Sequence, residues 1–178
     1  MKPPGPGLAV LVIFRGLPGT GKSHLVRQLV HAKPGLHVLS RDALRAAVLP
    51  RPAFSEEEKA LVDDLVCSMA GFLLDRSRSV VIDGAALSSA ARVDALVQVA
   101  ASRRLPVKIV ECTCCQDTAL SRIAGDDGSH EAGDRGEALY FQVKSRFQPV
   151  PHDCLVVDTD RPNDENLAAI LEYVDSWS

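Results

Sequence analysis

The chain of 178 residues has 46% hydrophobic and 24% charged residues, a composition typical of a globular protein with one well-packed core. Its net charge of −3 gives no general attraction to nucleic acids. No apolar stretch approaches the roughly 20 residues that cross a bilayer, so we expect no membrane partner. Five cysteines, an odd number, favour reduced free thiols and a cytoplasmic location over disulfides or a zinc site. We expect a flexible tail over residues 1–7 and a single domain over residues 8–178.

The first predicted elements enclose a glycine-rich loop. Residues 8–14 form an apolar run of strand length, and residues 24–31 continue with the apolar spacing of a helix. Between them lies a complete phosphate-binding pattern, G-x-x-x-x-G-K-[ST], whose glycines let backbone N–H groups converge on an anion at a helix N-terminus. We expect ATP to bind here, with Lys22 at the β- and γ-phosphates and Ser23 on Mg²⁺. The residues expected to bind the nucleotide are Gly16, Leu17, Pro18, Gly19, Thr20, Gly21, Lys22 and Ser23.

The rest of the chain alternates predicted strands and helices. Strands are expected at residues 37–39, 79–83, 106–112 and within 153–158, and helices at residues 41–48, 55–76, 88–104, 116–124, 137–147 and 163–173. This alternation predicts an α/β fold, a three-layer α/β/α sandwich around a mostly parallel five-stranded sheet, as in P-loop NTPases and kinases. In the longest helix, the apolar spacing predicts one buried face made of Leu61, Val62, Leu65, Val66, Met69, Phe72 and Leu73.

Two carboxylates follow predicted strands, at the sheet edge where parallel α/β folds bind their ligands. Asp83 ends the strand at residues 79–83 and is expected to orient Mg²⁺ or its waters, although an aspartate here is also a common turn residue. Gly84 follows it in place of a carboxylate that polarises water, which favours transfer to an acceptor over hydrolysis. Asp42 and Arg45 share one helical face, and two interpretations stay open. In the first, Asp42 accepts the proton of the acceptor hydroxyl and Arg45 holds the acceptor or the developing phosphoryl charge. In the second, the two residues form a surface ion pair.

The order of these motifs resembles the polynucleotide-kinase-like group of P-loop kinases. The matching segments are the glycine-rich loop, Ser40 to Arg45, Val80 to Ala85, Thr118 to Arg122 and the last strand, which ends at Thr159. The resemblance implies that Asp42 is the general base, Arg45 the clamp on the acceptor side, and Arg122 a lid arginine that binds the nucleotide or its phosphates. A lid is expected at about residues 125–136. The chain departs from this family in lacking polar side chains after its third strand and a second lid arginine, a role that Arg135 could take.

We therefore expect a kinase that uses ATP and Mg²⁺ and transfers the γ-phosphoryl group to a hydroxyl. Two acceptors stay open: a nucleic-acid 5′-hydroxyl, which the resemblance implies, and a small molecule, which suits the acidic chain better. The arginines that could form a basic rim for a polynucleotide are Arg41, Arg45, Arg51, Arg76 and Arg78. The alternative from another class is a nucleotide-binding switch or partner-binding module without phosphotransfer, which the missing polar side chains favour. The sequence leaves the oligomeric state open.

Overall fold

The computed structural model describes residues 9–49, 51–84, 86–125 and 136–176. In chain order, the described elements are β1 (Leu11–Arg15), α1 (Lys22–Ala32), β2 (His37–Ser40), α2 (Arg41–Val48), α3 (Glu56–Leu74), β3 (Val80–Asp83), α4 (Ala90–Ala101), β4 (Val107–Thr113), α5 (Gln116–Ala124), α6 (Glu137–Ser145), β5 (Cys154–Asp158) and α7 (Asn163–Asp175). Every strand and helix expected from the sequence is present, with ends that differ by a few residues. The predicted tail, most of the predicted lid, and Arg135 lie outside the described residues.

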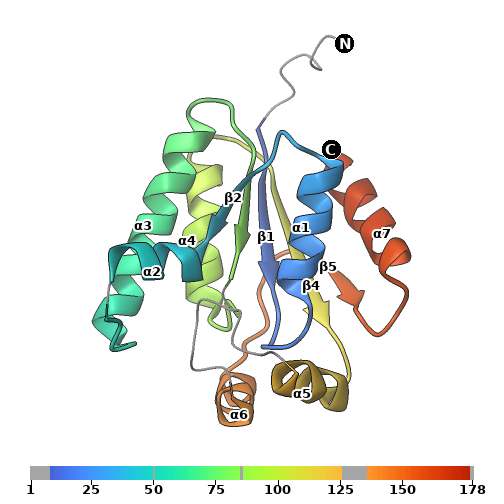
Figure 1. The fold of residues 1–178 in the computed structure, drawn as a ribbon. Coiled ribbons are helices and arrows are strands. Elements are labelled where there is room, and N and C mark those ends of the chain that lie inside the picture. The colour runs from blue at the N-terminus through green and yellow to red at the C-terminus, as the bar shows by residue number, and fades with distance from the viewer. Residues whose placement is uncertain (1–8, 50, 85, 126–135, 177–178) are drawn as a thin grey trace.

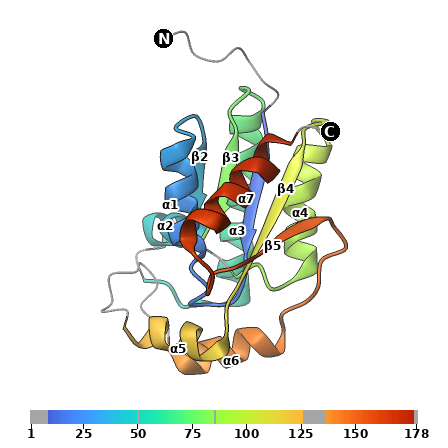
Figure 2. The ribbon, with the colours of Figure 1, turned by 90° about the vertical axis from the view of Figure 1, so that its right-hand side faces the viewer.

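The five strands form one sheet in the order β2-β3-β1-β4-β5, and every pairing is parallel. The predicted α/β sandwich is therefore confirmed, with a sheet that is wholly parallel. Helices α3 and α4 cover one face of the sheet, and α1 and α7 cover the other, while α5 and α6 lie beyond the carboxyl ends of the strands (Figures 1 and 2). No helix in the described part of the chain is long and apolar enough to cross a membrane.

The central strand β1 divides the core into two layers. Its side chains alternate: Leu11 and Ile13 pack with α3 and α4, whereas Val12 and Phe14 pack with α1 and α7. All five residues of β1 are buried, because helices cover both faces of a parallel sheet. The glycine-rich loop, which follows this strand directly, is thus attached to a fully buried strand at the centre of the sheet.

The predicted buried face of α3 is wrong at three positions. Leu61, Met69 and Phe72 are 47%, 39% and 56% exposed. The residues that α3 buries against the sheet and α4 are Val62, Val66, Ala70 and Leu74. Both sets have helical spacing, so α3 carries two apolar stripes, and the periodicity of the sequence could not show which one faces the core.

Candidate active site

The glycine-rich loop passes so close to its neighbours that side chains are excluded at two positions. A Cβ atom on Gly16 would lie 2.3 Å from the carbonyl oxygen of Cys112 in β4. A Cβ atom on Gly19 would lie 2.4 Å from the carbonyl oxygen of Ala119 in α5, and the φ of Gly19 is +77°, in the left-handed region. The loop therefore packs closely against both β4 and α5, and α1 begins where the loop ends.

Ser23 and Asp83, the residues expected to hold Mg²⁺, lie in contact. The hydroxyl of Ser23, at the start of α1, donates a hydrogen bond of 3.1 Å to Oδ1 of Asp83 at the end of β3. One hydroxyl and one carboxylate fit Mg²⁺, which keeps several waters and takes few protein ligands beside substrate phosphates. The described residues contain no cluster of three or more His, Cys, Asp or Glu that would suit another metal.

Two cations lie against the loop. Nζ of Lys22 donates to the carbonyl oxygens of Gly16 and Leu17, at 2.9 and 2.7 Å. Arg122, on α5, donates from Nη1 to the carbonyl oxygen of Gly19 at 3.3 Å and to Oγ1 of Thr159 at 2.9 Å. Arg122 therefore joins the loop to the segment after β5, and both cations can offset phosphate charge.

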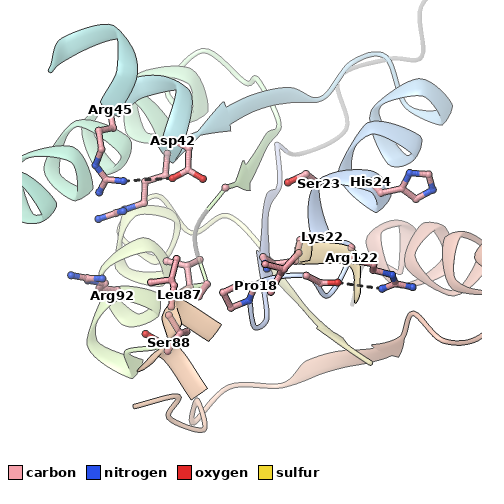
Figure 3. A pocket seen from close by; sticks show the side chains of 18 of the residues that line it. Pro18, Lys22, Ser23, His24, Asp42, Arg45, Leu87, Ser88, Arg92 and Arg122 are labelled. Carbon is pink, nitrogen blue, oxygen red and sulfur yellow. Dashed lines mark hydrogen bonds and ion pairs between the residues drawn. The ribbon is translucent and has the colours of Figure 1, made fainter. Parts of the chain in front are cut away.

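Asp42 lies in the first turn of α2, where the helix dipole favours a carboxylate. The turn is held by Ser40, whose side chain accepts a hydrogen bond of 3.1 Å from the backbone N–H of Ala43. Nη1 of Arg45 lies 3.5 Å from Oδ1 of Asp42, and the two side chains are only 8% and 13% exposed. The pair is thus not a surface ion pair, and it faces Lys22 and Arg122 across the cavity (Figure 3).

The structure explains why glycine follows Asp83. Gly84 has a φ of +92°, and a Cβ atom there would lie 3.2 Å from the backbone nitrogen of Asp42 and from Oγ of Ser40. A larger residue would push away the N-terminus of α2.

A cavity of about 300 Å³ lies between the loop, α2, α4 and α6, and most of its charged lining is positive. Among the described residues, the charged side chains that line it are Lys22, Arg27, Arg41, Arg45, Lys59, Arg92, Arg122, Arg146 and one carboxylate, Asp42. Asp63 partly offsets this charge, because its carboxylate pairs with Nε of Arg41 at 2.6 Å and with Nε of Arg92 at 3.1 Å. The cavity therefore suits an anionic ligand beyond the nucleotide phosphates.

Only part of the predicted basic rim lies at this cavity. Arg41 and Arg45 line it, whereas Arg51 and Arg78 do not, and Arg76 stacks on Phe72 at the outer end of α3. Sequence reasoning missed the contributions of Lys59, Arg92 and Arg146, along with the ring of Phe54, which lies below the guanidinium of Arg45 at 5.2 Å. The one available signal was for Arg92, which falls in the first turn of the helix after the β3 carboxyl end.

Cys112 lies at the floor of the loop and is fully buried. Burial raises the pKa of its thiol to about 12, so the sulfur stays neutral and is not a nucleophile. All five cysteines are free, as expected, although Cys115 is exposed. Near the cavity rim, the hydrogen bond from Lys59 lowers the pKa of the Glu56 carboxyl, which keeps that ion pair charged.

The fold and this loop are those of a P-loop NTPase with a five-stranded all-parallel sheet. Residues 11–150 match the AAA domain family, and the chain belongs to this family. Membership implies nucleotide binding.

The chain is also similar to a curated enzyme, the 2′,3′-cyclic-nucleotide 3′-phosphodiesterase of Rattus norvegicus. The two are 37% identical over 102 residues, which is 57% of this chain and 23% of that protein. The chain spans less than a quarter of the length of the curated relatives it matches.

Two solved structures of small kinases resemble the whole fold. A putative kinase from Chloroflexus aurantiacus has a TM-score of 0.73 and 19% identity, covering 94% of this chain and 99% of its own. The APS kinase of Mycobacterium tuberculosis, in complex with AMPPNP and APS, has a TM-score of 0.71 and 21% identity, covering 94% and 98%. At these identities the likeness concerns the fold.

Proposed function

We propose that the protein is a kinase that uses ATP and Mg²⁺ to phosphorylate a hydroxyl of a small anionic molecule. The observation that carries this proposal is the shared cavity: Asp42 and Arg45 line the same space as Lys22 and Ser23 of the glycine-rich loop. The fold likeness to an APS kinase described with both AMPPNP and APS supports it.

The proposed reaction is an in-line transfer. The acceptor oxygen attacks the γ-phosphorus, ADP leaves, and the hydroxyl proton passes to the carboxylate of Asp42. Lys22 and Arg122 offset charge on the transferred group, and Mg²⁺ at Ser23 and Asp83 would neutralise charge shared by the β- and γ-phosphates. Arg45, 3.5 Å from Asp42, would orient this carboxylate and hold an anionic group of the acceptor.

The cavity supports a small acceptor. The whole cavity, including the space beside the glycine-rich loop, has a volume of about 300 Å³, at the lower end of the range for small-molecule sites, which favours a small acceptor over a large one. On the side of Asp42, the three positive charges of Arg41, Arg45 and Arg92 outnumber the two negative charges of Asp42 and Asp63, which leaves a net positive charge there. A sugar or nucleoside that already carries a phosphate or sulfate fits this size and charge, and the 5′ end of a polynucleotide is the second acceptor to be tested.

The test is transfer of labelled γ-phosphoryl from ATP to hydroxyl compounds in matched pairs, each with and without a phosphate group, and to 5′-hydroxyl oligonucleotides. We expect the phosphorylated member of a pair to be preferred, and Arg45→Ala to remove that preference. Arg78→Ala is the matched control, because Arg78 is exposed and outside the cavity. Preference for the neutral member contradicts the anionic acceptor. Preference for oligonucleotides, with binding that falls steeply as salt rises, selects the polynucleotide.

The alternative is a nucleotide-binding module without phosphotransfer. One sequence feature favours it: Gly84, Ala85 and Ala86, which follow Asp83, carry no polar side chain. Tight ATP binding without transfer to any acceptor of the panel would support this module and overturn the kinase.

A further inference from the structure

Helix α3 carries an apolar stripe that the described part of this chain does not cover. Leu61, Met69 and Phe72 are 47%, 39% and 56% exposed, and the half-buried Leu65 lies between them. The helix forms an outer edge of the molecule, with its other side against α4 and the sheet (Figure 1). A helix that is apolar on two sides is typical of one that is buried on two sides.

Charges of opposite sign stand at the two ends of this stripe. At the N-terminal end, Glu57 is exposed and forms no ion pair or hydrogen bond within the described part of the chain. Its neighbours do form such contacts: Glu56 pairs with Lys59, and Glu58 accepts a hydrogen bond from the backbone N–H of Phe54. At the other end, the guanidinium carbon of Arg76 lies 3.6 Å from the ring centre of Phe72. The surface is therefore negative toward its N-terminal end, where Asp64 is exposed as well as Glu57, apolar along the stripe, and positive at Arg76, two residues past the end of α3.

We propose that this surface binds a second copy of the chain, with the two α3 helices packed side by side and antiparallel about a two-fold axis. Leu61 and Phe72 lie equally far along the helix from the midpoint between Val66 and Cys67. A two-fold axis at that midpoint therefore sets Leu61 of one copy opposite Phe72 of the other. Such a contact is self-complementary and closes at two copies.

The same axis pairs the charges. Glu57 and Arg76 are also equally far from that midpoint, so each Glu57 faces an Arg76 of the other copy, at both ends of the contact. A parallel arrangement would instead place Glu57 beside Glu57, which is unfavourable. The charge pattern thus selects the antiparallel pair.

The contact leaves the candidate active site open. Lys59, which lines the cavity, and Asp63, which pairs with Arg41, lie on the side of α3 opposite the stripe. Changes to the stripe should therefore leave ATP binding as it is, and this separates failure of the dimer from failure of the proposed function.

The test is sedimentation equilibrium of the full chain over a concentration series. We expect a monomer–dimer equilibrium for the wild type and a monomer for Phe72→Glu, with unchanged ATP binding as the sign of a folded variant. Val156→Glu is the matched control, because Val156 is 60% exposed on β5, away from α3. This variant should dimerise like the wild type.

A charge exchange tests the antiparallel pairing. Glu57→Lys and Arg76→Glu should each raise the dimer Kd by about 10-fold, since attraction becomes repulsion at two exposed pairs. The double variant should return the Kd to within about threefold of the wild type. A wild type that is monomeric at about 0.1 mM, a dimer that survives Phe72→Glu, or a double variant weaker than both single ones would each overturn the proposal.

Discussion

The close packing of the glycine-rich loop can be measured by comparing alanine at two of its glycines. Gly19 and Gly21 have nearly equal φ values, +77° and +76°. Their surroundings differ: a Cβ atom on Gly19 would lie 2.4 Å from the carbonyl oxygen of Ala119, whereas the nearest atom to one on Gly21 is 3.6 Å away. Left-handed backbone costs alanine roughly 1–2 kcal/mol in both variants. Gly19→Ala must also displace α5, which adds roughly 1–3 kcal/mol.

Thermal and urea unfolding without nucleotide would measure these costs. For a domain of this size each kcal/mol lowers the Tm by roughly 2–4 °C, so Gly19→Ala should melt roughly 2–12 °C below Gly21→Ala. Gly21→Ala is the matched control for the backbone strain alone. Equal losses of stability in the two variants would refute the packing of the loop against α5.

Three further predictions concern the metal site, the thiols and the core. Ser23→Ala should weaken binding of ATP with Mg²⁺ by about 10-fold or more, with little change when EDTA is present; an equal loss in both conditions would contradict a Mg²⁺ role. A chromogenic disulfide reagent at pH 8 should modify the exposed Cys115 rapidly and Cys112, with its pKa of about 12, only on unfolding. Val66→Ala should cost about 2 kcal/mol in urea unfolding, and a neutral result would contradict the register of α3.

Local sequence patterns predicted the fold because each strand and helix of this parallel α/β fold has a recognisable pattern within its own residues. The strands are short apolar runs, the helices have apolar spacing of 3–4 residues, and the loop from Gly16 to Ser23 is a contiguous motif. Asp83 was predicted in the same way, because it is the last residue of an apolar strand. Its hydrogen bond with Ser23 joins positions that the strand order brings to one edge.

What depends on tertiary packing could not be read from the sequence. The pairing of Asp42 with Arg45 followed from helical spacing, but its burial depends on what surrounds α2, so a surface pair was equally consistent. Arg92 and Arg146 reach the cavity from elements far along the chain, and no local pattern connects them to α2. The face of α3 was wrong for a related reason: both of its stripes are apolar, and only the packed sheet selects between them.

The most direct test of the proposed mechanism is Asp42→Asn, measured for both binding and turnover. The substitution keeps the shape of the side chain and removes its ability to accept a proton. With the best acceptor of the matched panel, kcat should fall by about 10²–10⁴-fold, while the Kd for ATP stays within about threefold of the wild type. Turnover equal to that of the wild type would remove Asp42 from the role of base and contradict the central claim.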